Sequence, residues 1–185
     1  MKIVKKSIVK RWALTVLAGT VFVIITIGVI MCVVTKNHYY NSVSMTLNSR
    51  ATSLVMSYFN SQTTVSDELF NKMAKNFVDN FSDKNVMEVW VIDKNGHVVV
   101  SSTGFSVKGE SYPDYNYAKA NESGTGEWIG RMKNNEKVMA LTYILPENSQ
   151  GVNGAIRYII SLQDIDRQIY IIWVLIGLLL ILVIC

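Results

Sequence analysis

Two long stretches without a charged residue constrain this chain more than any other feature. Residues 12–34 form an apolar run of 23 residues, and residues 169–185 form a second run of 17. A helix over the first run is roughly 34 Å long, enough to cross a bilayer core of about 30 Å. We therefore expect transmembrane helices at 12–34 and 169–185. No Lys or Arg follows the second run, so we expect that span to be truncated.

The charge distribution predicts the orientation in the membrane. Five of the 18 Lys and Arg residues precede the first run, while the other 13 share the segment 36–168 with all 14 Asp and Glu residues. The positive-inside rule places a tail at 1–11 in the cytoplasm and the domain 36–168 outside the cell membrane. A secretory signal has an apolar region of only about 7–15 residues, so an uncleaved anchor and a two-pass topology are expected.

The stretch VMEVWVIDKNGHVVVSS, residues 86–102, predicts a β-hairpin. Residues 86–92 are nearly all apolar, as in a strand that is buried on both faces. Asp93, Lys94, Asn95 and Gly96 provide turn residues, and Gly96 can adopt a positive φ. Residues 97–102 then form the returning strand.

An apolar stripe with helical spacing follows the first run. Residues 37–60 contain no Pro or Gly, which predicts one helix that continues out of the membrane. The stripe is close to a heptad seam and predicts either a homodimer interface or a helix that packs on its own sheet. Its members are Tyr40, Val43, Leu47, Ala51, Leu54 and Tyr58.

The remaining segments predict a mixed α and β domain. Thr64 or Ser66 can cap a second helix that extends to about residue 81. A Gly-rich loop at 103–126 includes a short helix at 114–121, and strands are expected at 127–132, 137–145 and 154–162. In the strand 137–145, odd and even positions should face opposite sides of the sheet. Ser161 then starts a helix that continues into the second span.

This order of elements resembles the extracytoplasmic PAS-like sensor domains (single Cache, or PDC) of bacterial sensor histidine kinases. The hairpin at 89–101 and the closing pattern G-x-x-R-x-x-x-S-L-x-D-I-D at 154–166 carry the resemblance. It implies an α+β fold with a long N-terminal helix and a five-stranded antiparallel sheet. It also implies a homodimer and a cytoplasmic output module after the second span, which would act on a response regulator.

Aromatic and basic residues of the second half are the candidate ligand-binding residues. Tyrosines and a tryptophan can line a pocket, and arginines on strands can bind an anionic ligand through two parallel hydrogen bonds. The alternative is that the tyrosines pack on the sheet and the arginines face water. The candidates are Tyr112, Tyr115, Tyr117, Trp128, Arg131 and Arg157.

Most other chemistry is not expected. Cys32 and Cys185 lie in the apolar runs, which excludes a disulfide framework in the central domain. His38 and His97 show no metal-ligand spacing, and no nucleotide-binding loop or catalytic set is visible. We therefore expect no metal, no cofactor and no catalytic residue. The central domain has no basic stripe, so nucleic-acid binding is not expected.

Together these features predict the signal-input region of a two-component sensor histidine kinase that detects an extracellular cue, with a small molecule as a possible ligand. The same input could serve a chemoreceptor or a cyclic-dinucleotide enzyme. A different alternative is a two-span membrane protein whose outer domain binds a partner protein and has no ligand.

Overall fold

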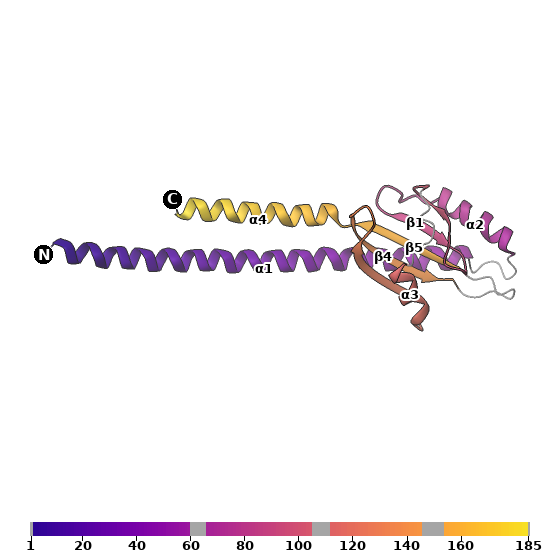
Figure 1. Cartoon of the computed structure of the whole chain (residues 1–185), viewed down its shortest axis with the longest axis horizontal. Helices are drawn as coiled ribbons and strands as arrows, with labels where there is room; N and C mark the ends of the chain where they lie inside the picture. The colour runs from indigo at the N-terminus through magenta and orange to yellow at the C-terminus, as the bar shows by residue number, and fades with distance from the viewer. Residues whose placement is uncertain (1, 60–65, 105–111, 146–153, 185) are drawn as a thin grey trace. The chain divides into compact units, whose positions relative to one another are not determined.

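The computed structural model describes residues 2–59, 66–104, 112–145 and 154–184; within helix α1 the side chains of residues 2–7 and 50–57 are not described. Figure 1 shows the order of the elements along the chain. The chain divides into two compact units. One consists of Met1–Tyr40 and Asp164–Cys185, and the other is Asn41–Gln163.

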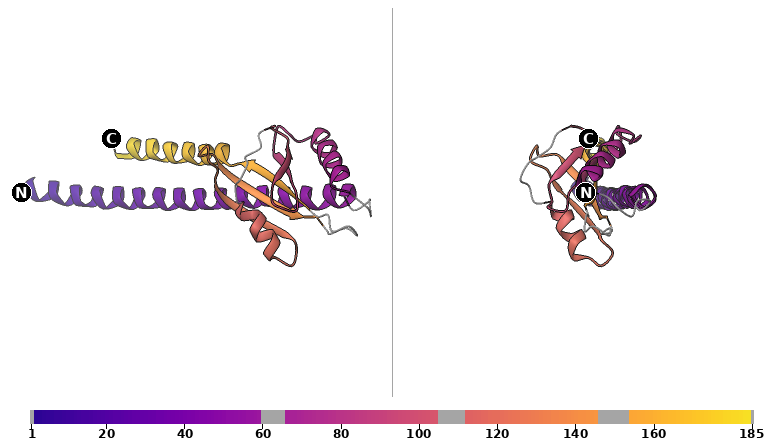
Figure 2. Two further views of the ribbon diagram at one scale, coloured as in Figure 1. Left: turned by 45° about the vertical axis from the view of Figure 1, so that its right-hand side comes forward. Right: turned by 90° about the vertical axis from the view of Figure 1, so that its right-hand side faces the viewer.

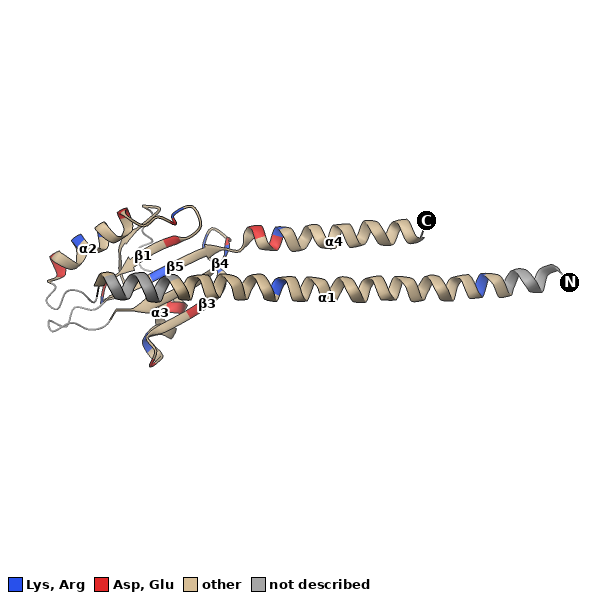
Figure 3. Cartoon of the chain, turned by 180° about the vertical axis from the view of Figure 1, so that it is seen from behind, with Lys and Arg blue, Asp and Glu red and all other residues tan. Residues whose placement is uncertain are grey.

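Two helices form the first unit. Helix α1 (Lys2–Phe59) is continuous through the first apolar run and beyond it, which confirms the predicted uninterrupted helix. Helix α4 (Gln163–Ile184) contains the second run. Both are long and apolar enough to cross a membrane, judged by length and composition. In Figure 3, the described charges of α4 lie in its first turns, at Asp164, Asp166 and Arg167.

The apolar parts of α1 and α4 pack against each other. A Cβ added to Gly28 would lie only 2.7 Å from Cδ1 of Ile176, and Cys32 is 6% exposed. The Tyr40 hydroxyl donates a hydrogen bond of 3.2 Å to Oδ1 of Asp166. The least exposed residues recur every three or four positions on both helices, as in a coiled-coil seam. They are Leu17, Val21, Ile24, Gly28, Cys32 and Thr35 of α1, and Ile165, Ile169, Ile172, Ile176, Leu180 and Val183 of α4.

The second unit is built on a five-stranded antiparallel sheet. Its strands are β1 (Glu88–Ile92), β2 (Val98–Ser101), β3 (Thr125–Arg131), β4 (Lys137–Ile144) and β5 (Ala155–Ser161). Their order across the sheet is β2-β1-β5-β4-β3, so β5 pairs with both β1 and β4. With the long N-terminal helix, this is the predicted α+β architecture. Each predicted strand agrees with an observed one to within two residues.

The two faces of the sheet are covered by different helices. Helix α2 (Asp67–Asp79) and the end of α1 lie on one face, where the Phe81 ring packs 6.1 Å from the ring of Tyr158. Helix α3 (Pro113–Ala120) packs on the opposite face, against β3 and β4. Figure 2 shows α2 and α3 on opposite sides of the sheet. In β4 the predicted alternation is confirmed, because Val138, Ala140, Thr142 and Ile144 face α3.

Helix α2 begins where a polar side chain can cap it. Ser66 Oγ accepts a hydrogen bond of 3.3 Å from the backbone N–H of Leu69, which confirms one of the two predicted caps. The other candidate, Thr64, lies outside the described residues. Phe70, Met73 and Phe77 form the buried face of the helix. That face closes the apolar layer behind the sheet.

The hairpin turn has the geometry that its residues predict. The backbone N–H of Gly96 donates to the carbonyl of Asp93 at 3.0 Å, and that of Asp93 donates to the carbonyl of His97 at 2.8 Å. The Asp93 carboxylate also accepts hydrogen bonds from the backbone N–H groups of Asn95 and His97. Gly96 has φ of +86°. Its left-handed conformation is what lets β2 return beside β1.

We predict that Gly96→Val destabilises the domain by about 1 kcal/mol or more, because a β-branched residue is strained at positive φ. Urea unfolding of the full chain in detergent measures the effect. Lys94→Val is the matched control: it lies in the same turn without a positive φ, and a shift below about 0.5 kcal/mol is expected. Equal losses in the two variants would contradict the role of Gly96.

Candidate functional site

One row of residues crosses the middle of the sheet and presents its side chains toward α3. The strand register places Trp90 of β1 opposite Arg157 of β5, and Arg157 opposite Thr142 of β4. Gly126 of β3 continues the row beside Thr142. Because directly opposed residues share a face of a sheet, these positions converge below α3. The row therefore contains an arginine, a threonine and a tryptophan, and it ends at a glycine, which has no side chain.

Asp114, in the first turn of α3, completes an ion pair with this row. Nε of Arg157 donates to Oδ2 of Asp114 at 2.7 Å, and Nη2 donates to Oδ1 at 2.9 Å. The hydroxyl of Thr142 donates to Oδ2 at 2.6 Å. Asp114 and Thr142 are 0% exposed and Arg157 is 2% exposed. The buried carboxylate thus receives three hydrogen bonds, two of them in the bidentate geometry that arginine favours.

Two aromatic rings lie against the guanidinium. The Arg157 Cζ atom is 4.5 Å from the ring centre of Tyr112 and 5.0 Å from that of Trp90. The two rings meet edge to face, with centres 5.4 Å apart. The indole N–H of Trp90 donates to Glu88, which also accepts a hydrogen bond from Thr103. Cation–π attraction and a fixed tryptophan orientation therefore hold the Arg157 side chain in place.

Helix α3 approaches the sheet so closely that only glycine fits beneath it. A Cβ added to Gly126 would lie 2.1 Å from the carbonyl oxygen of Asp114 and 2.4 Å from the backbone nitrogen of Ala118. Pro113 occupies the first turn, where its missing N–H costs nothing. This close contact places the Asp114 carboxylate at hydrogen-bonding distance from Arg157 and Thr142.

Tyr115 lies beside the ion pair on the same helix. Burial, and then the negative charge of Asp93, raise the pKa of the Tyr115 phenol above its usual value of 10.0. A raised pKa means that the folded protein holds this proton more tightly than the unfolded chain. The contribution to stability is therefore complete below pH 10 and is lost as the pH rises through the raised pKa. At neutral pH the phenol is therefore uncharged.

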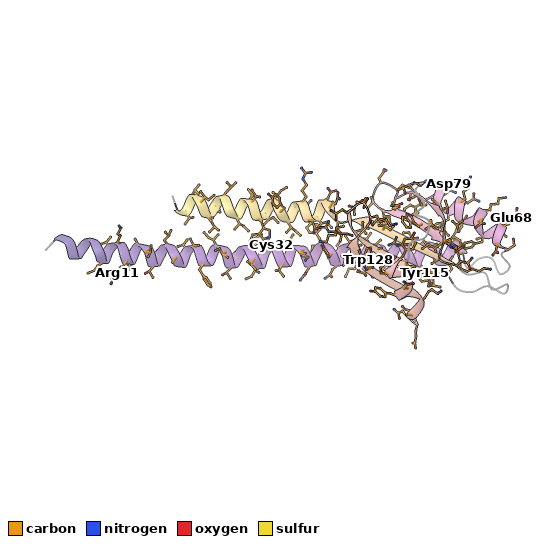
Figure 4. All side chains as sticks on the ribbon, viewed as in Figure 1. Arg11, Cys32, Glu68, Asp79, Tyr115 and Trp128 are labelled. Atoms are coloured by element: carbon orange, nitrogen blue, oxygen red, sulfur yellow. The ribbon has the colours of Figure 1, made fainter. Side chains whose placement is uncertain are left out.

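The structure brings together four of the six predicted ligand-binding residues. Tyr112, Tyr115 and Arg157 are buried, and the half-buried Trp128 packs on the same cluster. Figure 4 labels Tyr115 on α3 and Trp128 on β3. The other two lie elsewhere: Tyr117 is 56% exposed, and the exposed Arg131 donates to the backbone oxygen of Asn135 at 2.9 Å. A ligand-binding role for these residues stays a prediction.

Three members of the site were not predicted: Asp114, Thr142 and Trp90. One signal was available, because Arg157 interrupts the otherwise apolar AIRYIIS of β5, and a charge in a buried strand needs a partner. The partner itself has no local signature, since Asp114 lies 43 positions away in the chain. The sequence pattern indicates only that Asp114 belongs to a short helix.

The members of the predicted dimer seam that the structure describes differ in exposure, and their role in a dimer stays a prediction. Leu47 is 0% exposed, and Tyr40, Val43 and Tyr58 are half-buried. The Tyr58 ring packs 5.4 Å from the ring of Phe77. The side chains of Ala51 and Leu54 lie outside the described residues. Leu47 is thus used by the fold of a single chain, while Met45 of α1 is 72% exposed.

Within the described part of the chain, no group of three or more His, Cys, Asp or Glu residues could hold a metal ion. His97 is exposed and lies 3.5 Å from the carboxylate of Asp93, next to the hairpin turn. His38 packs edge to face on Tyr39.

Comparison with solved structures yields distant matches. No family model matches the sequence, and no curated protein matches it. The extracellular domain of vpHK1S-Z8, a protein assigned as a histidine kinase, aligns with 74% of this chain and 57% of its own at 9% identity and a TM-score of 0.46. A transcriptional regulator of Mycobacterium tuberculosis aligns with 43% of this chain and 30% of its own at 13% identity and a TM-score of 0.30. The chain thus covers less than two thirds of either protein, and neither match defines a function for it.

Proposed function

We propose that this chain is the signal-input region of a membrane-bound sensor histidine kinase, with Asn41–Gln163 as a Cache-type sensor domain outside the cell. The observation that carries the proposal is the direct connection of this domain to two apolar helices. Only Leu162 separates β5 from α4, and no break separates the apolar part of α1 from its part in the domain. The N-terminal tail with its five cations lies in the cytoplasm under this proposal.

Strand β5 links the buried site to the membrane helix. It carries Arg157, pairs with both neighbouring strands and ends two residues before α4 begins. The backbone N–H of Leu162 donates to the carbonyl of Lys137 at 2.8 Å, which fixes the end of β5 to β4. Helix α3 and the sheet below it could adopt two arrangements, and a ligand with different affinities for them would shift the equilibrium between the two. Because β5 forms part of this site and leads into α4, a displacement of β5 would be passed on to α4. A cytoplasmic response regulator would receive the output.

A chimaera tests this function. The full chain is joined after residue 185 to the cytoplasmic linker and kinase of an unrelated receptor. Seven fusions are made, each with a junction one residue longer than the last, so that the kinase is attached at different rotations about the helix axis. We expect at least one fusion whose autophosphorylation changes at least threefold when Thr142→Val alters the site. The matched control is Thr46→Val, because Thr46 is exposed and bonds only within α1. Identical activity of all fusions with either substitution would contradict the proposal.

A homodimer is part of the proposed mechanism, and its interface is testable. Met45 is exposed on α1, and Leu47, two residues away, is buried in its own chain. In a background without Cys32 and Cys185, we expect Met45→Cys to form an interchain disulfide in membranes and Leu47→Cys to form little. Glu122→Cys, at an exposed loop position, reports random collision. Equal cross-linking at positions 45 and 122, or stronger cross-linking at 47, would contradict this interface.

One observation favours the second candidate function, a two-span protein that binds a partner and has no small-molecule ligand. The guanidinium of Arg157, the predicted anion-binding group, is already satisfied by Asp114 and two aromatic rings of the same chain. A site filled by its own side chains is what a ligand-free domain would have. A chemoreceptor or a cyclic-dinucleotide enzyme would share the input, and the reading frame beyond codon 185 of the native gene distinguishes these outputs.

A further inference from the structure

We propose that Arg157, Thr142, Trp90 and Tyr112 form a carboxylate-binding site whose resident occupant is the side chain of Asp114. Helix α3 therefore supplies the bound carboxylate from within the chain. A free carboxylate ligand can bind only in a variant that lacks the Asp114 side chain. The existence of the site is independent of the proposed function. A use of the site in signalling, in which α3 would be released from the sheet, rests on the proposed function.

The donors around Asp114 have the arrangement of a receptor for a carboxylate. Two parallel N–H donors of Arg157 contact both oxygens at 2.7 and 2.9 Å, and the Thr142 hydroxyl supplies a third hydrogen bond at 2.6 Å. All three donor groups come from the central strands β5 and β4, whereas the acceptor comes from α3. The hydrogen-bond donors and the occupant therefore belong to different structural elements, whereas Tyr112 is the N-cap residue of α3 itself.

The receptor side is held in place by contacts that do not involve Asp114. The rings of Trp90 and Tyr112 lie 5.0 and 4.5 Å from Cζ of Arg157, and the indole N–H of Trp90 is held by Glu88. The backbone of Arg157 is paired with strands on both sides. Removing the Asp114 carboxylate should therefore leave the guanidinium oriented and without its counterion, rather than collapse the site.

Burial makes the guanidinium require an anion. Arg157 is 2% exposed, so a state without Asp114 leaves a buried positive charge uncompensated, which is strongly unfavourable. Truncating Asp114 to alanine removes three heavy atoms, the size of a carboxylate group, directly in front of the donors. Formate matches this space and charge, and acetate carries the same charge with one additional methyl group. Acetamide has the shape of acetate without its charge.

Chemical rescue tests the proposal on the full chain in detergent micelles at pH 7. Asp114→Ala should lower the melting temperature by roughly 10 °C or more. Sodium acetate at 100 mM should return roughly 5–10 °C of this loss if it binds with millimolar affinity. Acetamide, and sodium chloride at the same ionic strength, should return less than a third of that amount. The wild type should show no shift specific to acetate.

The double variant Asp114→Ala/Arg157→Met is the matched control, because it keeps the cavity but lacks the cation. Its melting temperature should not respond to acetate. If Asp114→Ala does not fold alone, the yield of refolding from urea in acetate compared with acetamide gives the same answer. Equal effects of acetate and acetamide, or an equal acetate effect on the wild type, would overturn the proposal. This experiment measures the stability of the protein and not kinase activity. Rescue by acetate can therefore succeed even if the kinase chimaera gives no response.

Discussion

Arg157→Met should destabilise the unit Asn41–Gln163 by about 3–5 kcal/mol, among the largest losses that a single substitution can cause here. The substitution leaves the Asp114 carboxylate buried, with the Thr142 hydroxyl as its remaining side-chain donor among the described residues. It also removes the cation between the rings of Trp90 and Tyr112. Urea unfolding can be followed by the fluorescence of Trp90 and Trp128, with Trp12 and Trp173 replaced by phenylalanine.

Two companion variants separate the ion pair from a general effect of losing arginine. Arg131→Met changes an exposed arginine that bonds to a turn carbonyl, and it should cost less than about 0.5 kcal/mol. The double variant Arg157→Met/Asp114→Leu removes both charges and should recover at least half of the loss, because well-packed apolar groups often replace a buried pair at little cost. A double variant no more stable than Arg157→Met would show that the ion pair is not the source of the effect.

The sheet could be predicted from the sequence because its signals are local. The hairpin turn requires a residue with positive φ, and Gly96 lies where the turn needs it, at φ +86°. In β4 the strict alternation of Val138, Ala140, Thr142 and Ile144 against their neighbours fixed which side chains share a face. These patterns depend only on the period of two residues in a strand and on turn stereochemistry.

The site could be predicted only in part, because its main contact joins residues that are distant in the chain. Arg157 is a sequence candidate for anion binding, with exposure to water as the alternative, and neither expectation includes its pairing with Asp114 of the same chain. This pairing depends on how α3 docks on β3, and this docking depends on Gly126. A single glycine between Thr125 and Glu127 gives no indication of which helix will cover it.

The helical stripe of α1 shows a second limit of sequence patterns. Periodicity identified an apolar face, yet it cannot tell which apolar surface covers that face. Leu47 is fully buried in its own chain, whereas Met45, outside the stripe, is exposed. A helix that packs on its sheet and a helix that pairs with a second copy have the same spacing of apolar residues.

Gly126→Ala is expected to cost at least about 2 kcal/mol, although it adds one methyl group to an edge strand. The new Cβ would lie 2.1 Å from the carbonyl oxygen of Asp114 and 2.4 Å from the nitrogen of Ala118, both of them backbone atoms. Backbone cannot rotate away, so α3 must move. The matched control is Gly130→Ala on the same strand, whose Cβ would meet the side chain of the half-buried Trp128. That ring can change rotamer, so a loss of about 1 kcal/mol is expected.

A double-mutant cycle connects this contact to the ion pair. Thr142→Val alone removes one hydrogen bond to the Asp114 carboxylate and should cost about 1.5–3 kcal/mol. In a Gly126→Ala background α3 has already moved, and the bonds of 2.6–2.9 Å to Asp114 are already weakened. Thr142→Val should then cost at least about 0.5 kcal/mol less than it does in the wild type. Additive losses would mean that α3 can shift without disturbing Asp114, and the close approach at Gly126 would then serve packing alone.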